Sequence, residues 1–521
     1  MYDYIIVGAG SAGCVLASRL TEDANAKVLL LEAGEPDKKK EIHIPAAFAK
    51  LFKSSCDWAY NTEAQPKLNN RSLFWPRGKM LGGSSSMNAM IYIRGHQRDF
   101  DGWRQLGNEG WGYRDVLPYF KKAEHQERGA SEYHGAGGPL NVADLRLINP
   151  ISRAFTAAGG ELGFPFNEDF NGADQEGFGF YQVTQKNGKR CSTAAGYLKP
   201  ALKRKNLTVY TGAHVTRLLF EGTRAVGAEY IRNGRAESVR ADREVILSGG
   251  AINSPQLLML SGVGPAGHLK QLGISVVIDL QGVGQNLQDH LLAPVAYAST
   301  KPITLAKAES LLNIASYLLF KKGQLTSNLA ETGGFVKTDT SLLSPDVQFH
   351  AGATYYINHG FVLPEGHGFT ICPTLIRPKS VGQLTLRSND PLAAPTIEPS
   401  YLDYDEDLRT LVKGIKLAIE LAHTRALSSY RGKAYFENLK TESDIIEHIR
   451  NTAETIYHPA GTCKMGGDSM SVVDSNLRVH GATNLRVVDA SVMPEIVGGN
   501  PNAAVIMIAE KAADLIKSES S

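Results

Sequence analysis

The chain has 521 residues, of which 43% are hydrophobic and 21% are charged, and its formal net charge is +2. A chain of this length exceeds one ordinary hydrophobic core, so we expect two domains. The near-balance of charged residues excludes the strongly basic composition that is typical of nucleic-acid-binding proteins.

Residues 2–32 predict a strand, a glycine turn, a helix, a second strand and an acid, in that order. Gly8, Gly10 and Gly13 have the G-x-G-x-x-G spacing, which allows a tight turn, a close approach to a pyrophosphate and close helix packing. The helix N-terminus, with Ser11 and Ala12 in its first turn, presents free N–H groups to phosphates. The alternative is an ordinary glycine turn.

Glu32 follows the second strand, nineteen residues after Gly13, and Ala33 follows it. A carboxylate at this position can accept a hydrogen bond from a ribose hydroxyl. These features together predict a dinucleotide site. They do not distinguish FAD from NAD, although the acid argues against NADP.

The middle of the chain continues this pattern. Four segments have strand patterns and short turns between them: residues 208–211, 215–220, 225–231 and 237–241. Residues 244–248 are expected to form a buried strand, followed by a helix from Ser254 that feeds the same sheet.

From residue 292 to residue 454 the pattern changes. The alternating segments 346–350 and 382–387 indicate an antiparallel sheet, and residues 407–422 predict a helix. The tail again predicts a strand, at 485–489, and a helix, at 503–517, which we expect to return to the first sheet.

We therefore expect an α/β protein with a discontinuous, Rossmann-like nucleotide-binding domain. It would comprise residues 1–150, 200–291 and 455–521. The second, substrate-binding domain, of α+β type and built on the antiparallel sheet, would comprise residues 151–199 and 292–454.

Residues 311–320 form an apolar run that ends in Lys321 and Lys322. We favour a helix of the core for this segment. The alternatives are a lid over the pocket and a shallow contact with a membrane.

Five cysteines are scattered along the chain: Cys14, Cys56, Cys191, Cys372 and Cys463. They match no metal-binding spacing, so we expect no metal, and an odd, scattered set is typical of a reducing compartment. The first expected strand begins beside Met1, leaving no room for a cleaved signal peptide, and no apolar run is long enough to span a membrane. We expect a cytoplasmic protein, and leave open a peripheral contact with the inner face of the membrane.

Three further stretches carry a family resemblance: residues 78–88, residues 250–264, and the C-terminal pair 457–463 and 500–502. Together with the N-terminal fingerprint, they resemble the glucose–methanol–choline (GMC) oxidoreductases over essentially the whole chain. Within that family the chain looks most like bacterial FAD-dependent alcohol, choline and sorbose dehydrogenases. The resemblance implies FAD rather than NAD.

By this resemblance, His458 corresponds to the active-site histidine of the family. An imidazole titrates near neutral pH, so it can accept the proton of an alcohol hydroxyl. Asn502 is the expected partner of the substrate oxygen. The alternative is that Asn500 or Asn502 caps the C-terminal helix, with Pro501 in its first turn, and we expect Asn500 and Pro501 to border the cofactor.

The resemblance also implies a set of flavin-binding residues in and beside the loop 78–88: Gly82, Ser84, Ser85, Asn88 and Ala89. Some relatives attach FAD covalently through a histidine of this loop. Met87 stands at that position here, so we expect noncovalent FAD.

Further cofactor contacts are implied for Asp489 and Ala490, near the pyrophosphate and the ribityl chain, and for Val215, near the adenine. The segment 286–290 looks familial, and we expect it to act as scaffold, with His290 structural. Glu331 and His350 match positions near the substrate pocket of choline-type relatives. For Glu331, attraction of a cationic substrate and a buried structural role are equally supported.

The expected reaction is the FAD-dependent oxidation of a primary alcohol to an aldehyde, with hydride transfer to flavin N5 and a histidine base. Electrons would pass to a quinone or a similar acceptor. The alternatives are an oxygen-using oxidase, a flavin-containing hydroxynitrile lyase and a non-catalytic nucleotide-binding protein. The substrate class stays open among aliphatic alcohols, sugars, choline and ring-bearing alcohols.

Overall fold

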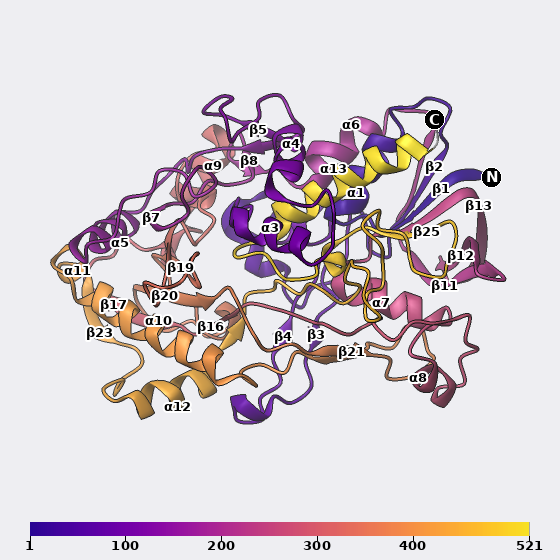
Figure 1. Ribbon diagram of the computed structural model, residues 1–521. Coiled ribbons are helices and arrows are strands. Elements are labelled where there is room, and N and C mark those ends of the chain that lie inside the picture. Colours follow the sequence, from indigo (N-terminus) through magenta and orange to yellow (C-terminus); the bar gives the residue numbers. More distant parts are fainter. Residues whose placement is uncertain (520–521) are drawn as a thin grey trace.

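A seven-stranded sheet assembled from distant parts of the chain organises one half of the computed structural model, which describes residues 1–519 (Figure 1). Its path is β10-β2-β1-β13-β12-β11, and β25 pairs with β13. The strands are β1 (Tyr2–Val7), β2 (Val28–Leu31), β10 (Leu207–Tyr210), β11 (Ala213–Glu221), β12 (Arg224–Arg232), β13 (Arg235–Leu247) and β25 (Leu485–Val487). The pairs among β10, β2, β1, β13 and β25 are parallel, and β11, β12 and β13 pair antiparallel.

The strand β13 corrects one prediction. We expected two strands, at 237–241 and 244–248, but one strand spans both and pairs antiparallel with β12 in its first half and parallel with β1 in its second. The exposed pair Asp242 and Arg243 interrupts the apolar pattern, yet no Gly or Pro stands there to turn the chain.

Two helices far apart in sequence pack together beside the parallel strands. They are α1 (Ser11–Leu20) and α13 (Asn502–Glu519). The buried Glu510 carboxylate accepts two hydrogen bonds from the Arg19 guanidinium, each 2.8 Å long. The tail thus returns to the first sheet, as its strand–helix pattern predicted.

A second sheet, of eight strands, is antiparallel in every pair. Its path is β23-β17-β20-β19-β18-β7, with β16 joining β20 to β24. The strands are β7 (Gly177–Phe180), β16 (Leu291–Leu292), β17 (Val295–Ser299), β18 (Thr332–Val336), β19 (Val347–Gly352), β20 (Gly368–Leu375), β23 (Arg431–Ala434) and β24 (Glu454–Thr455). The α/β class with a second, antiparallel sheet is therefore confirmed, while the residue boundaries of the two domains stay a prediction.

The remaining elements surround these sheets. The helices are α2 (Lys40–His43), α3 (Gln97–Gln105), α4 (Tyr113–Ala123), α5 (Pro150–Glu161), α6 (Lys199–Ala201), α7 (Gly250–Leu260), α8 (Ala266–Gln271), α9 (Leu311–Phe320), α10 (Asp405–His423), α11 (Arg425–Ser428) and α12 (Glu442–Thr452). The short strands are β3 (Tyr60–Asn61), β4 (Phe74–Trp75), β5 (Glu124–Gln126), β6 (Leu140–Val142), β8 (Gln185–Lys186), β9 (Lys189–Arg190), β14 (Val263–Gly264), β15 (Ile278–Asp279), β21 (Gln383–Thr385) and β22 (Thr396–Glu398).

Two expected elements differ in detail. The segment 382–387 gives only β21, which pairs with β22 and lies outside the large antiparallel sheet. The helix α7 begins at Gly250, before the expected Ser254, because the Asp489 carboxylate accepts a hydrogen bond from the Gly250 amide and so extends the first turn.

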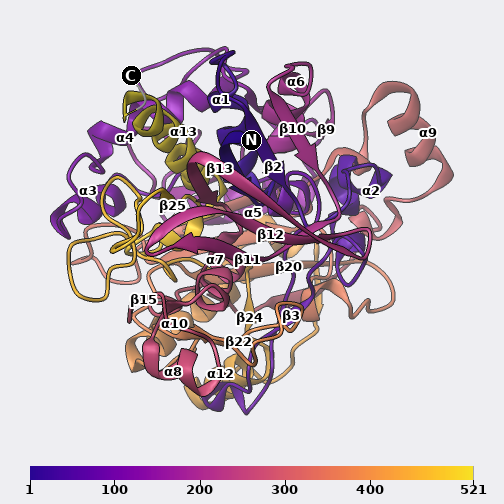
Figure 2. The ribbon, with the colours of Figure 1, turned by 90° about the vertical axis from the view of Figure 1, so that its right-hand side faces the viewer.

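The position of helix α9 contradicts the expectation from its sequence. We favoured a core helix, yet α9 protrudes from the molecule (Figure 2), and Leu311 and Leu312 are 86% and 84% exposed. Its leucines have the hydrophobicity of a buried helix, but within residues 1–519 no other element packs over this face, so it stays exposed. In residues 1–519 no helix is both long enough and apolar enough to cross a membrane.

Candidate functional site

A cavity of about 330 Å³ lies between the carboxyl ends of the parallel strands and the antiparallel sheet. Val7, Leu31 and Leu247, the last residues of β1, β2 and β13, line one side. His350 of β19 and Thr370 of β20 line the other. Ligands of open α/β sheets bind at this edge, outside the carboxyl ends of the strands.

The glycine turn after β1 is fixed by steric contacts. Gly8 has φ +97°, and a Cβ there would lie 2.5 Å from the Ser248 carbonyl oxygen. A Cβ on Gly13 would lie 1.9 Å from the Gly8 carbonyl oxygen. Gly8, Gly10, Ser11 and Ala12 line the cavity, and no side chain of the described residues, 1–519, caps the N-terminus of α1. The turn therefore leaves the first amides of α1 free to bind an anion.

Glu32 is buried at the end of β2 and borders the same cavity, next to Ala33. Its carboxylate accepts hydrogen bonds from the amides of Ala9 and Gly34, each 2.8 Å long. Burial raises the pKa of this carboxyl group to about 7. Val215, at the start of β11, also lines this end of the cavity.

The loop 78–88 closes over the glycine turn. The Gly82 amide donates to the Ala9 carbonyl oxygen over 2.7 Å, and a Cβ on Gly83 would lie 2.7 Å from Gly10 Cα. Ser84, Asn88 and the following Ala89 line the cavity.

Gly82 and Ser85 are not among the lining residues. The Ser85 hydroxyl donates to the Gly82 carbonyl oxygen over 2.6 Å and lies 2.8 Å from Thr193 Oγ1. Gly82 and Ser85 therefore stabilise the turn from which Ser84 reaches the cavity.

Asp489 is buried at the edge of the cavity, beside Ala490. Its carboxylate accepts hydrogen bonds from the Gly250 amide (2.8 Å), the Ser254 hydroxyl (2.6 Å) and the Ser491 amide (2.8 Å). The acid thus joins the segment after β25 to the start of α7, and burial raises its pKa.

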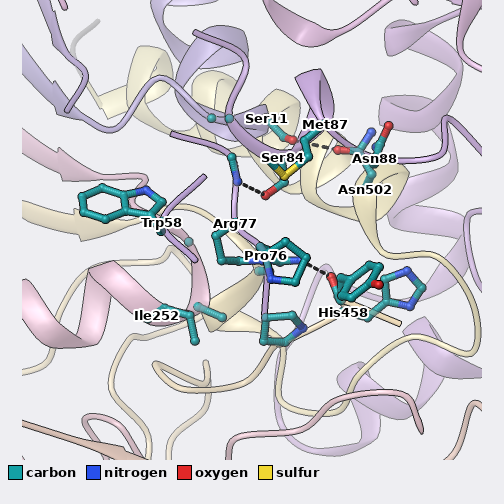
Figure 3. Close-up of a pocket in the computed structure, with 18 of the residues that line it drawn as sticks. Ser11, Trp58, Pro76, Arg77, Ser84, Met87, Asn88, Ile252, His458 and Asn502 are labelled. Carbon is teal, nitrogen blue, oxygen red and sulfur yellow. Dashed lines mark hydrogen bonds between the residues drawn. The ribbon is translucent and has the colours of Figure 1, made fainter. Parts of the chain in front are cut away.

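His458 lines the opposite part of the cavity from Trp58 (Figure 3). Its Nε2 lies 3.3 Å from Asn500 Nδ2, and its Nδ1 lies 3.0 Å from His290 Nδ1. An amide nitrogen only donates, so Nε2 accepts, the proton is on Nδ1, and His290 Nδ1 accepts it. The His458 amide donates to the Asp289 carboxylate over 2.8 Å.

The surroundings of His458 keep its imidazole neutral. Burial, above all, holds the pKa of His458 well below its ordinary value, and the nearby His290, His350 and Arg77 act in the same direction. A neutral imidazole with an accepting Nε2 toward the cavity is the form that a general base requires.

The two asparagines of the C-terminal motif point to different partners. Asn500 lies against His458, and its Oδ1 accepts a hydrogen bond from Gln348 Nε2 over 3.0 Å. Asn502, the first residue of α13, instead accepts a 2.7 Å hydrogen bond from the Ser11 hydroxyl (Figure 3). Both line the cavity, as does Pro501.

His350 lines the cavity, and its Nδ1 lies 3.1 Å from Thr374 Oγ1. Its Nε2 is buried and has no hydrogen-bond partner in the described part of the chain. Burial lowers the pKa of His350 to about 3, so its imidazole is neutral.

Glu331 is not among the lining residues. Its buried carboxylate accepts hydrogen bonds from the Ser327 hydroxyl (2.6 Å), the Asn149 amide (2.7 Å) and the Ser152 hydroxyl (2.8 Å). Glu331 therefore lies behind the cavity wall, where it holds the start of α5.

The segment 286–290, expected to act as scaffold, holds His458. His290 contacts its side chain, and Asp289 accepts a hydrogen bond from its backbone amide. Sequence reasoning missed an apolar and aromatic wall, because its members come from four segments that are far apart in the chain: Phe48 and Phe52, Leu329, Tyr356, and Tyr457.

Comparison with known proteins agrees with this geometry. Family models described as GMC oxidoreductase match residues 2–292 and 378–509. An alcohol dehydrogenase [acceptor] of Pseudomonas putida is 50% identical, over 99% of this chain and 96% of its own length. The mitochondrial choline dehydrogenase of Homo sapiens is 48% identical, over 99% of this chain and 90% of its own.

Solved structures share the fold over the full length. Pyridoxine 4-oxidase from Mesorbium loti superposes with a TM-score of 0.92 at 34% identity, covering 99% of each chain. A formate oxidase of Aspergillus oryzae, from a study of FAD modification, has a TM-score of 0.93 at 30% identity and covers 99% of this chain and 98% of its own.

The cavity fits FAD by its own chemistry. The glycine turn and the uncapped start of α1 can accommodate a pyrophosphate, and the Glu32 carboxylate, which borders the cavity, can accept a hydrogen bond from a ribose hydroxyl. Ser248 Oγ and Asn328 Oδ1 belong to lining residues, are buried, and lack a hydrogen-bond partner within residues 1–519. The chain therefore belongs to the GMC oxidoreductase family and is an FAD-dependent oxidoreductase.

Proposed function

We propose that the protein oxidises an uncharged primary alcohol to an aldehyde, with His458 as the base, and passes the electrons to a quinone-like acceptor. The alcohol dehydrogenase [acceptor] relative, 50% identical over 99% of this chain, supports both the reaction and the use of an acceptor. The observation that carries the proposal is the neutral imidazole of His458, whose accepting Nε2 lies beside the Asn500 amide at the cavity surface.

His458 Nε2 would take the hydroxyl proton. The hydrogen bond from Nδ1 to His290 keeps Nε2 unprotonated before the reaction and orients the ring. The Asp289 carboxylate, bonded to the His458 amide, holds the backbone at this position. FAD, when bound, supplies the hydride acceptor at N5.

We assign contact with the substrate oxygen to Asn500 rather than to Asn502. Asn500 Nδ2 already donates beside the base, so it can also donate to an oxygen that gains negative charge there. His350 Nε2, which lacks a partner within residues 1–519 and lines the same wall, is the second polar group for that oxygen. Asn502, joined to Ser11 at the start of α1, belongs to the cofactor side.

The wall around His458 favours an uncharged, apolar substrate over choline. Phe48, Phe52 and Leu329 line it, whereas the acids among the lining residues, Glu32 and Asp489, belong to the nucleotide side. A permanently cationic substrate could contact aromatic faces at this end of the cavity, but no carboxylate of the described chain lines it there.

A panel of alcohols tests the proposal. Purified holoenzyme is assayed with an artificial electron acceptor on straight-chain primary alcohols, choline, a sugar and a ring-bearing alcohol. We expect the highest kcat/KM for the straight-chain alcohols, and the reverse order would contradict the substrate class. His458→Ala should lose about 10²- to 10⁴-fold in turnover while keeping FAD, because general-base catalysis contributes about that factor.

Two further experiments distinguish the proposed dehydrogenase from an oxygen-using oxidase and from a flavin-containing lyase. The pyridoxine 4-oxidase and formate oxidase likenesses leave oxygen as a candidate acceptor. Peroxide measured with and without the dye separates an oxidase from a dehydrogenase. Anaerobic bleaching of the flavin by a simple alcohol separates both from a lyase, which leaves its flavin oxidised.

A further inference from the structure

The helix α9 presents an unusually apolar face to the outside. Leu311, Leu312, Leu318, Leu319 and Phe320 are between 63% and 86% exposed. Four of them, the leucines, follow a spacing that places them on one side of the helix. We call these five residues the α9 face. A contiguous apolar surface of this kind marks a contact site rather than ordinary surface.

The opposite side of α9 holds the helix to the protein. Tyr317 is 3% exposed and belongs to a small cluster with Leu305 and Leu325, against which Ile314 and Ile44 pack. Since the packing uses this side alone, the α9 face contributes nothing to the core. Figure 2 shows α9 standing away from the body, with α2 near its base.

Basic residues flank the α9 face in sequence. Lys307 precedes α9, Lys321 and Lys322 follow it, and the one acid within residues 305–323, Glu309, is ion-paired with Lys50. At the end of α9, Arg146 Nη1 donates to the Lys321 carbonyl oxygen over 3.4 Å. The exposed lysines Lys186 and Lys189 come from the β8–β9 hairpin, whose Gly188 packs on that carbonyl: a Cβ on Gly188 would lie 2.6 Å from it.

We propose that the α9 face docks on an anionic lipid bilayer, with its leucines in the interface and the surrounding lysines against the headgroups. An apolar face with a basic border is the pattern of helices that lie in the membrane interface. A second copy of the chain fits less well, because a twofold contact through this face would bring the lysines of both copies together.

The docked orientation brings the bilayer to one wall of the cavity. Leu329 packs against the α9 cluster and also lines the cavity, and Phe48 lines it from the neighbouring segment Pro45–Leu51. An apolar alcohol or acceptor dissolved in the bilayer would then be near the site. This consequence, unlike the docking itself, rests on the proposed function.

Vesicle flotation tests the docking with full-length holoenzyme. The vesicles are either phosphatidylcholine alone or an equal mixture of phosphatidylcholine and phosphatidylglycerol. We expect the protein to float with the anionic vesicles at low salt, and to bind less at high salt and with the neutral vesicles. Leu312→Ser combined with Leu319→Ser should weaken binding at least about tenfold, because each leucine loses a favourable transfer from water.

The matched control is Leu202→Ser combined with Leu343→Ser, two exposed leucines outside α9 (49% and 71%), which should float like the wild type. Lys186→Glu combined with Lys322→Glu should remove the preference for anionic vesicles. Dye-coupled turnover should be unchanged in all three variants, so a failed alcohol assay does not affect the flotation result. Wild type that stays unbound, or an α9 variant that floats fully, would overturn the proposal, as would self-association without lipid that the α9 variant abolishes.

Discussion

The Nδ1 atoms of His290 and His458 lie 3.0 Å apart, and their rings meet nearly at right angles, at 86°. One imidazole must donate and the other accept, so the two rings fix each other's tautomer. Burial lowers the pKa of His290 to about 3, which keeps it neutral and able to accept. His290 thus orients the His458 ring, while its neighbour Asp289 holds the His458 backbone.

His290→Leu should lower kcat by the equivalent of about 1–3 kcal/mol, because His458 loses the acceptor that orients it. KM should change little, since His290 is not among the residues that line the cavity. His290→Gln retains an acceptor oxygen and should recover part of the loss. Steady-state kinetics at equal FAD content give kcat and KM for both variants. A His290→Leu variant as active as the wild type would show that His290 contributes only packing.

The pH profile of kcat/KM should show no acidic loss of activity near pH 6.5. A base works deprotonated, and the pKa of His458 lies well below its usual value, so activity falls only when the pH drops well below that value. Initial rates with a primary alcohol and a dye acceptor, corrected for stability at each pH, give the profile. An acidic limb centred at or above the usual histidine pKa would contradict a buried, neutral base.

Asn500→Leu and Asn502→Leu should separate two roles. The first removes the donor beside His458 Nε2 and should lower kcat by about 10²- to 10³-fold with FAD content unchanged. The second removes the partner of the Ser11 hydroxyl and should weaken FAD binding more than turnover per bound flavin. Flavin absorbance after gel filtration measures FAD binding, and turnover per flavin measures catalysis. If Asn502→Leu lowers turnover per flavin and Asn500→Leu lowers FAD content, Asn502 is the catalytic amide.

FAD should be released by acid precipitation. Met87 lines the cavity. By the family resemblance it stands where some relatives carry the histidine that binds FAD covalently, and its thioether does not form such a bond. The supernatant should therefore be yellow and the protein pellet colourless. A yellow pellet after washing would show that another residue attaches the cofactor.

Glu510→Leu should destabilise the protein by about 3–5 kcal/mol, because it leaves the Arg19 guanidinium without its main buried partner. Tyr197 also loses a hydrogen bond, of 2.8 Å. Chemical denaturation of the apoprotein measures the change. Adding Arg19→Met should recover part of the stability, and a double variant as unstable as the single one would point to packing rather than to the ion pair.

Local sequence was sufficient to predict the strand–turn–helix–strand unit that forms one end of the cavity. Gly8, Gly13 and Glu32 lie within one strand–turn–helix–strand unit, so their spacing already implies their geometry. The same holds for α10, whose apolar period predicted a helix over 407–422 and which extends over Asp405–His423.

Tertiary structure decided the rest. Asn500 and Asn502 have the same side chain and stand two residues apart, and only the turn into α13 directs one to His458 and the other to Ser11. His290 and His458 are 168 positions apart, and α9 has the composition of a core helix with no layer to cover it. A sequence pattern encodes the backbone conformation of neighbouring residues, whereas contacts between distant segments depend on how whole sheets and helices pack.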